Sequence, residues 1–126
     1  MVGKTVFCLE HILKSVKFDD RIAVCANSID IHCSKGVNYT PHDGSNYYIP
    51  LSCLISCDIK NLLTAGKSLS ADKYAFAAVR VMPPCFAMWE AAGICASLAA
   101  KEDVDAENVP YKKVQSELLK RGAYLD

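Results

Sequence analysis

The sequence predicts a mixed α/β fold of the α+β kind, formed by a single domain or by a fragment of one, and three observations support this. Residues 21–32 and 47–55 are rich in the β-branched and aromatic side chains that favour strands. Residues 83–100 and 109–122 carry proline at or near their start, as helices often do. The 126 residues suffice for one hydrophobic core and fall below the length at which chains usually divide into domains.

The N-terminal part of the chain predicts a short helix, one or two strands and then a turn-rich segment. Residues 6–16 place apolar side chains at roughly helical spacing, which predicts the helix. Residues 21–32 are β-branched and partly alternating, which predicts one or two strands ending near His32. Residues 33–46 contain glycine, proline, aspartate and asparagine, so we expect a loop or the tip of a hairpin there.

The middle of the chain predicts two further extended segments. Residues 47–55 are largely apolar, and Pro50 lacks a backbone donor, so this segment is expected at a sheet edge or at the start of a strand. Residues 61–66, with the sequence NLLTAG, form a short apolar run that ends at Gly66. This run predicts a short strand followed by a tight turn.

Two helices are expected next. Ser70 stands in an N-cap position with Asp72 in the first turn, so a brief helix or turn is expected within residues 70–81. The pair Pro83-Pro84 requires an extended residue before it and suits the first turn of a new helix. We therefore expect a buried, alanine-rich helix from about Pro84 to Ala100.

The last element is predicted to be an amphipathic surface helix over residues 109–122. Its pattern places Val114, Leu118 and Leu119 on one face, and Gly122 serves as a C-terminal cap. The sequence contains no internal repeat and no low-complexity tract.

The composition excludes several classes of partner. Fourteen basic and fourteen acidic residues are scattered along the chain, so no electrostatic footprint for nucleic acid or for an anionic membrane is present. The apolar region 79–100 carries two charges and two prolines, which argues against a membrane span. Residues 1–20 are interrupted by charge every few positions, unlike a signal peptide. We therefore expect a cytoplasmic protein with no nucleic-acid and no membrane partner.

The seven cysteines are expected to be reduced thiols, because their number is odd and several stand in apolar runs. Some cysteines and histidines lie near one another in the sequence and invite a zinc hypothesis, but their spacing matches none of the compact zinc patterns. These residues are His32, Cys33, His42, Cys53 and Cys57. We expect no metal site.

A strand, a glycine and a helix in succession let the backbone approach a ligand closely and aim free N–H groups at negative charge. Residues 61–100 fit this pattern, yet Gly66 suits an ordinary turn and Gly93 suits a contact between packed helices equally well. The small residues around Gly93 suit a helix that lies against a sheet or a flat ring, and also an ordinary core. No G-x-G pair and no P-loop motif occurs anywhere in the chain.

Two further residues are candidates for chemistry. His32 ends an apolar strand and suits an acid or base role, or an ordinary structural hydrogen bond. Arg80 stands between two valines, and its guanidinium requires an anion, carbonyl oxygens or solvent. A helix-end arginine that reaches the surface is the alternative interpretation of Arg80.

Five stretches together resemble the C-terminal part of the FAD-dependent oxidoreductases, the glutathione-reductase-like flavoproteins. They are FDDRIAVCANSIDIH, YYIPLSCLI, NLLTAGKSLSA, AAVRVMPPCFAMWEAAGICASLAA and VQSELLKRGAYL. The resemblance covers nearly the whole chain in order and without large gaps. It implies that residues 1–60 correspond to strands and a loop of a substrate domain, and that residues 61–126 complete the flavin site.

The resemblance also implies roles for particular residues. The turn would lie along the edge of a non-covalently bound FAD, and the helix beginning at Pro84 would point its N–H groups at the cofactor. The implied cofactor contacts are Gly66, Lys67, Ser70, Ala71, Ala91, Ala92 and Gly93. Arg80 and His32 match positions on the substrate side, where anion contact and proton handling are implied.

The chain departs from the family pattern at several positions. The dinucleotide-binding half with its G-x-G-x-x-G motif is absent from this sequence. Trp89 stands where the family usually has glycine, and Glu90 where it usually has glutamine. Lys67 replaces the commoner arginine, which keeps the charge without the planar fork, and Asp72 replaces threonine.

We therefore expect a C-terminal portion or subunit of an FAD-dependent oxidoreductase that acts on a small-molecule substrate. Catalysis would require the missing N-terminal half or a second copy of the chain as partner, and the chain alone would be inactive. The alternative is a non-enzymatic assembly protein, a remnant of such an enzyme, that associates with itself to cover apolar surface.

Overall fold

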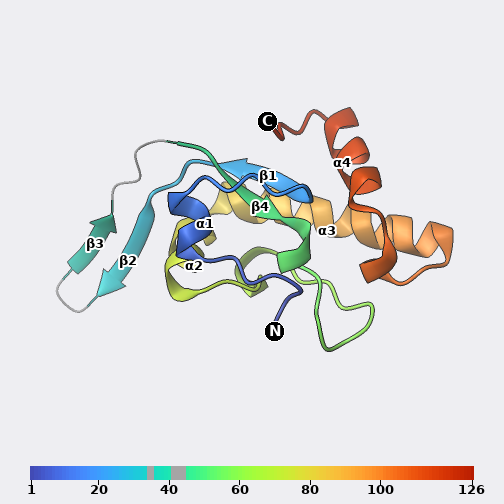
Figure 1. Ribbon diagram of the computed structural model, residues 1–126, viewed down its shortest axis with the longest axis horizontal. Coiled ribbons are helices and arrows are strands. Elements are labelled where there is room, and N and C mark those ends of the chain that lie inside the picture. The colour runs from blue at the N-terminus through green and yellow to red at the C-terminus, as the bar shows by residue number, and fades with distance from the viewer. Residues whose placement is uncertain (34–35, 41–44) are drawn as a thin grey trace.

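The computed structural model describes residues 1–33, 36–40 and 45–126, and it confirms the predicted mixed α+β fold (Figure 1). Its longest element is helix α3 (Met82–Glu102), which packs against a small antiparallel sheet. The two chain ends lie on opposite sides of the body in this view.

The strands form two antiparallel pairs. Strand β1 (Arg21–Cys25) pairs with β4 (Tyr47–Pro50) and packs against α3, so this pair belongs to the core. Strand β2 (Ile29–Cys33) pairs with β3 (Gly36–Thr40) in a hairpin that projects from the body (Figure 1). The region expected to hold one or two strands thus holds two, β1 and β2.

Residues 33–46, expected to be a loop or the tip of a hairpin, belong in part to the β2–β3 hairpin and also contain a strand that was not predicted. Strand β3 occupies Gly36–Thr40, because its sequence GVNYT contains three residues that favour strands despite the glycine before them. Residues 34–35 and 41–44, including His42, lie outside the described residues.

The expected extended segments between residues 47 and 66 are shorter than predicted. After β4 the chain turns into a 3₁₀ helix at Leu51–Cys53. The strand expected at NLLTAG reduces to a single bridge between Leu63 and Ile55, and a second 3₁₀ helix follows at Gly66–Ser68. Pro50 pairs with Arg21 at the end of its strand, where its missing N–H removes no internal ladder bond.

Helices α1 (Leu9–Leu13) and α2 (Lys73–Val79) are short and lie side by side. The N-cap of α2 is Asp72 and not Ser70. The Asp72 carboxylate accepts hydrogen bonds from the amides of Tyr74 and Ala75 at 2.9 and 2.7 Å. A carboxylate satisfies two of the free amides at a helix start, which explains why the helix begins after Asp72.

The two C-terminal helices form close to where the sequence predicts them. Helix α3 begins at Met82 and helix α4 spans Tyr111–Lys120. Val114 and Leu118 are buried as expected, but Leu119 is 56% exposed. Residues four apart share one face of a helix, whereas the next residue is turned away by about 100°. A 3₁₀ turn, Ala106–Asn108, joins the two helices.

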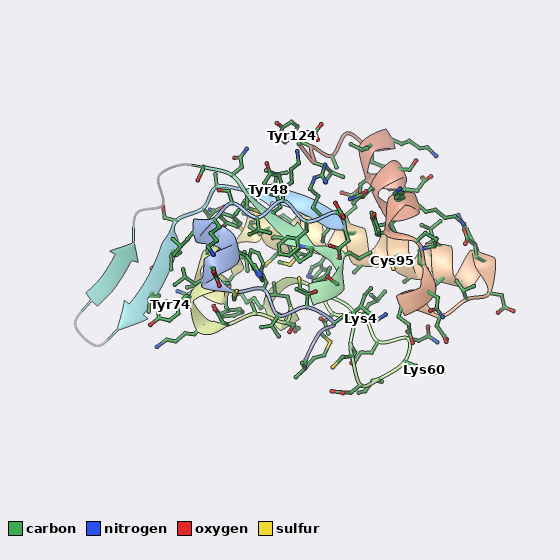
Figure 2. The ribbon with its side chains drawn as sticks, in the orientation of Figure 1. Lys4, Tyr48, Lys60, Tyr74, Cys95 and Tyr124 are labelled. Atoms are coloured by element: carbon green, nitrogen blue, oxygen red, sulfur yellow. The ribbon has the colours of Figure 1, made fainter. Side chains whose placement is uncertain are left out.

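The core lies between α3, the β1–β4 pair and α2. Tyr47 on β4 is completely buried, and its hydroxyl donates a hydrogen bond to the Ala78 carbonyl at 3.3 Å. Met88 and Ala91 of α3 are also completely buried. Further along α3, the buried Cys95 thiol donates to the Ala106 carbonyl at 3.6 Å, where the chain turns towards α4 (Figure 2).

No single helix of the described residues is long and apolar enough to cross a membrane. Helices α2 and α3 taken together have the length and the apolar composition of a membrane span, but they are bent by 94° at the break between them.

Candidate functional site

The predicted turn and the start of α3 line an open cavity of about 650 Å³. Its lining comes from two parts of the chain that are more than ten residues apart, and most of it is apolar. The lining residues are Ala65, Gly66, Lys67, Ser68, Arg80, Val81, Met82, Cys85, Phe86 and Trp89. Volumes of this size are usual for pockets that hold small organic ligands.

Gly66 lies in the wall of this cavity, against the Trp89 side chain. Its φ of +61° lies in the left-handed region, which glycine adopts without a steric penalty. An added Cβ would lie 2.6 Å from the indole nitrogen of Trp89 and 3.3 Å from its Cδ1. The backbone conformation therefore favours glycine, and a Cβ at this position would displace the exposed indole ring that lies against it.

The first half of α3 exposes three large apolar side chains. Met82, Phe86 and Trp89 are 72%, 69% and 67% exposed, and their spacing places them on one helix face. All three line the cavity, so this face forms one of its walls. Exposed aromatic side chains gathered in this way are typical of a surface that binds a ligand or a partner.

The start of α3 offers fewer amide donors than the family resemblance implies. Pro83 and Pro84 lie in the first turn and carry no N–H, and the Cys85 amide already donates to the Val81 carbonyl at 3.3 Å. The helix also begins at Met82, two residues earlier than expected. A ligand there would meet the positive end of the helix dipole rather than a row of free amides.

Two cations border the cavity. Lys67 is exposed beside Gly66. Arg80 ends α2, and its guanidinium donates to the Asp30 carbonyl on β2 at 3.0 Å. Arg80 therefore finds a backbone carbonyl acceptor, one of the partners expected from the sequence, and it ties the hairpin to the cavity wall.

His32 follows two residues after Asp30 on β2, and its backbone belongs to the strand. Its side chain lies outside the described part of the structure, so its proposed role stays a prediction.

Ser70 and Ala71 lie behind the turn and do not line the cavity. Ser70 is 4% exposed, its carbonyl accepts the Phe7 amide at 2.9 Å, and its own amide donates to the Cys53 carbonyl at 2.9 Å. Ala71 forms a parallel bridge with Phe7. In this chain the two residues connect the turn to the N-terminal segment.

Ala91, Ala92 and Gly93 lie further along α3. Ala91 is completely buried in the core and Ala92 packs against the core. Gly93 is exposed, and an added Cβ would meet no atom within 4 Å. Gly93 lines a second cavity of about 390 Å³ between α3 and α4, which shares Trp89 with the first cavity.

The sequence did not place Cys85 at this site. Its half-buried thiol lines the cavity and donates to the Val79 carbonyl at 3.8 Å. By contrast, burial raises the pKa of the Cys25 and Cys53 thiols to about 12. The six described cysteines are all free, as expected, and the described residues contain no cluster of three or more histidines, cysteines and carboxylates able to hold a metal ion.

A family model for FAD-dependent oxidoreductases matches residues 1–118, which is nearly the whole chain. The chain belongs to this family of flavoprotein oxidoreductases. Comparison with curated proteins and comparison with solved structures gave no match.

The cavity residues fit a flavin ring in three respects. The volume suits a small organic ligand, the lining is mainly apolar, and Lys67 and Arg80 supply positive charge at the border. In a fourth respect the fit is conditional, because the Trp89 indole already covers Gly66. A flavin ring that reaches Gly66 would have to displace the exposed Trp89 side chain.

Proposed function

We propose that this chain forms the C-terminal, flavin-contacting part of a glutathione-reductase-like FAD-dependent oxidoreductase. The observation that carries the proposal is the apolar cavity at the Gly66 turn, which lies within the matched region and is bordered by Lys67 and Arg80. Because the sequence has no G-x-G pair, tight binding of the pyrophosphate and adenosine of FAD requires a second protein surface, whereas the flavin ring would bind weakly to this chain by itself. That surface is a dinucleotide-binding unit or a second copy of the chain.

Different residues of the cavity would contribute in different ways to binding the flavin ring. The apolar wall of Met82 and Phe86 excludes water from one side of the ring. Lys67, on a flexible stem, would supply positive charge beside the ring and so favour the negative charge of the reduced flavin, and Arg80 would add a second cation from a fixed position. When bound, the flavin itself supplies hydride transfer to or from a small-molecule substrate.

The proposal extends to the substrate side. Arg80 connects the cavity to β2, and His32 stands on the same strand. In the active assembly, we assign Arg80 to contact with an anionic group of the substrate and His32 to proton transfer.

Titration of the purified chain with FAD, followed by flavin fluorescence, tests this function. We expect saturable binding that is several-fold weaker in Lys67→Gln, because the substitution removes the exposed cation at the border of the cavity. Lys60→Gln is the matched control, since Lys60 is an exposed lysine that does not line the cavity. Equal affinity in the two variants would remove Lys67 from the site, and no binding to either would contradict the proposal.

The second candidate is a non-enzymatic protein that associates with itself, and the exposed Met82, Phe86 and Trp89 favour it. Burying these side chains against a second copy would cover apolar surface. Sedimentation with and without FAD separates the two candidates. A dimer that dissociates in Phe86→Glu and is unaffected by FAD supports the assembly protein, whereas a monomer–dimer equilibrium that FAD shifts in either direction supports the flavin site.

A further inference from the structure

The outer face of α3 carries a continuous stripe of uncharged residues. Its members follow one another at alternating spacings of four and three residues, and all of them are exposed. They are Met82, Phe86, Trp89, Gly93, Ala96 and Ala100. The spacing averages about 3.5 residues, the repeat by which one helix packs lengthwise along another. Because the opposite face of α3 is buried in the core, the helix is apolar on both sides, which is typical of a helix that is covered on both.

Gly93 lies in the middle of α3, where the fold of the chain gives no reason for a glycine. Its backbone is helical, and an added Cβ would meet no atom within 4 Å. Glycine destabilises the interior of a helix relative to alanine. A glycine at an exposed position does, however, let a bulky group from outside approach the helix backbone closely. Gly93 therefore points to a neighbour that packs on this face.

The stripe has a large half and a small half, and their positions are complementary. The three large side chains lie towards the N-terminal end of α3, and the three small residues lie towards its C-terminal end. The large residues lie nine, five and two positions from the centre of the stripe, and so do the small ones on the other side. A second α3 laid antiparallel would therefore match every large residue with a small one. The pairs are Met82 with Ala100, Phe86 with Ala96, and Trp89 with Gly93.

We propose that two copies of the chain associate through α3, antiparallel and about a two-fold axis at the level of Ala91. The large side chains of each copy pack onto the small residues of the other, so the contact is self-complementary. A parallel pair would instead place Trp89 against Trp89 and Gly93 against Gly93, which crowds one end and leaves gaps at the other. This pairing rests on the self-association proposed above as the second candidate function, and it requires no flavin.

The surface that such a pair buries is sufficient for a specific dimer. Met82, Phe86 and Trp89 are each at least two-thirds exposed. Large side chains can bury about 150–250 Å² each, so the loss of roughly 100 Å² from each of the three is well within reach. The small half that they cover loses a similar area. Over both copies the total is on the order of 1,200 Å², the size at which specific interfaces begin, so we expect a dissociation constant in the micromolar range.

Sedimentation velocity of the full chain, under reducing conditions and without FAD, tests the pairing at concentrations from about 1 to 200 μM. We expect a monomer–dimer equilibrium within this range. Gly93→Leu should weaken the dimer about tenfold or more, because the added side chain fills the space that receives Trp89 while leucine favours the helix. Ser116→Leu is the control, since Ser116 is an exposed small residue of α4 outside the stripe, and it should leave the dimer within about twofold of the wild type.

The decisive test exchanges the two sizes within one pair. Ala96→Phe places a phenylalanine opposite Phe86, and Phe86→Ala leaves an alanine opposite Ala96, so each single variant should weaken the dimer about tenfold. The double variant again has one large and one small residue at this contact, and it should dimerise within about threefold of the wild type. Circular dichroism of each variant checks that the helices are retained.

A wild-type chain that stays monomeric up to the highest concentration would overturn the proposal, and so would a dimer that Gly93→Leu leaves unchanged. A double variant as weak as the single variants would overturn the antiparallel register. Because no flavin is present in these measurements, none of these outcomes bears on the flavin site. Saturable FAD binding by a monomeric chain would keep that site and assign the stripe to a different protein.

Discussion

The indole nitrogen of Trp89 lies 2.6 Å from the position that a Cβ would take on Gly66. A side chain from the middle of α3 thus covers the turn that the family resemblance assigns to the flavin edge. The ring is 67% exposed, so it is held at this place by few neighbours. Access to the cavity therefore depends on where this one side chain lies.

Replacing Trp89 by glycine should strengthen FAD binding. Because the substitution uncovers Gly66, the ring no longer has to displace an indole, and we expect an affinity on the order of tenfold higher by calorimetric titration. Tyr74→Gly is the control, since Tyr74 is an exposed aromatic residue of α2 that does not line the cavity. Both variants carry the cost of a glycine within a helix, about 1 kcal/mol. Equal affinities in the two variants would exclude Trp89 as the side chain that limits access.

Gly66→Ala tests the packing of the turn against the indole. Gly66 and Gly122 have φ of +61° and +90°, so alanine is strained at both positions and should cost about 1 kcal/mol in the free energy of unfolding. Only at Gly66 does the added Cβ meet Trp89, because nothing lies within 4 Å of a Cβ at Gly122. We expect Gly66→Ala, and not Gly122→Ala, to shift the tryptophan emission and to increase its quenching by acrylamide. An unchanged emission would show that the indole does not lie against the turn.

Asp72→Ala should destabilise the protein by about 2 kcal/mol, because one carboxylate serves two helices. Besides capping α2, it accepts the Leu9 amide at the start of α1 at 2.9 Å. Urea unfolding measures the change, and Asp19→Ala, an exposed aspartate, is the control. We expect an intermediate loss in Asp72→Asn, which keeps one acceptor oxygen. A loss in Asp72→Ala no larger than that of the control would contradict the double cap.

Stability should fall in alkaline solution. The Cys25 and Cys53 thiols have pKa values of about 12 in the folded chain against an ordinary value of 9.0, because burial disfavours the thiolate. Their stabilising contribution is complete below about pH 9, and it is lost as pH rises towards 12, since the unfolded chain then releases protons that the folded chain retains. Each thiol contributes a slope of about 1.4 kcal/mol per pH unit in this range.

Urea unfolding at pH 8 and pH 10.5, with a reducing agent present, measures this effect. We expect a lower free energy of unfolding at the higher pH, and a smaller difference in Cys25→Ala than in the wild type. Equal stability at the two pH values would show that the buried thiols do not titrate differently in the two states.

Local sequence signals were sufficient for much of the fold. The proline pair at the start of α3 and the apolar spacing of Val114 and Leu118 in α4 are short-range patterns, and the structure confirms both helices. Strand β3 was not predicted because the residues on either side of it favour turns. Residues 36–40 form a strand because they pair with β2, and local sequence does not show this pairing. The strand at NLLTAG was overpredicted because Leu63 finds only one bridging partner, Ile55.

The candidate site was harder to predict than the fold, because it depends more on contacts between residues that are far apart in the sequence. The positive φ of Gly66 agrees with the predicted tight turn, and Lys67 and Arg80 do border one cavity. The contact of Trp89 with Gly66 spans more than twenty residues, and no local pattern predicts it. The place of Cys85 in the cavity was missed because an apolar neighbourhood in the sequence suggests a buried core thiol.

The most direct test of the account is a titration of the wild-type chain with FAD, followed by intrinsic fluorescence. Trp89 is the only tryptophan in the sequence, so the signal comes from the side chain that covers the proposed flavin position. We predict saturable quenching of Trp89 that follows the same binding curve as the change in flavin fluorescence. Tryptophan emission that stays constant while FAD is raised to saturating concentrations, after correction for absorbed light, would contradict a flavin site at the Gly66 turn.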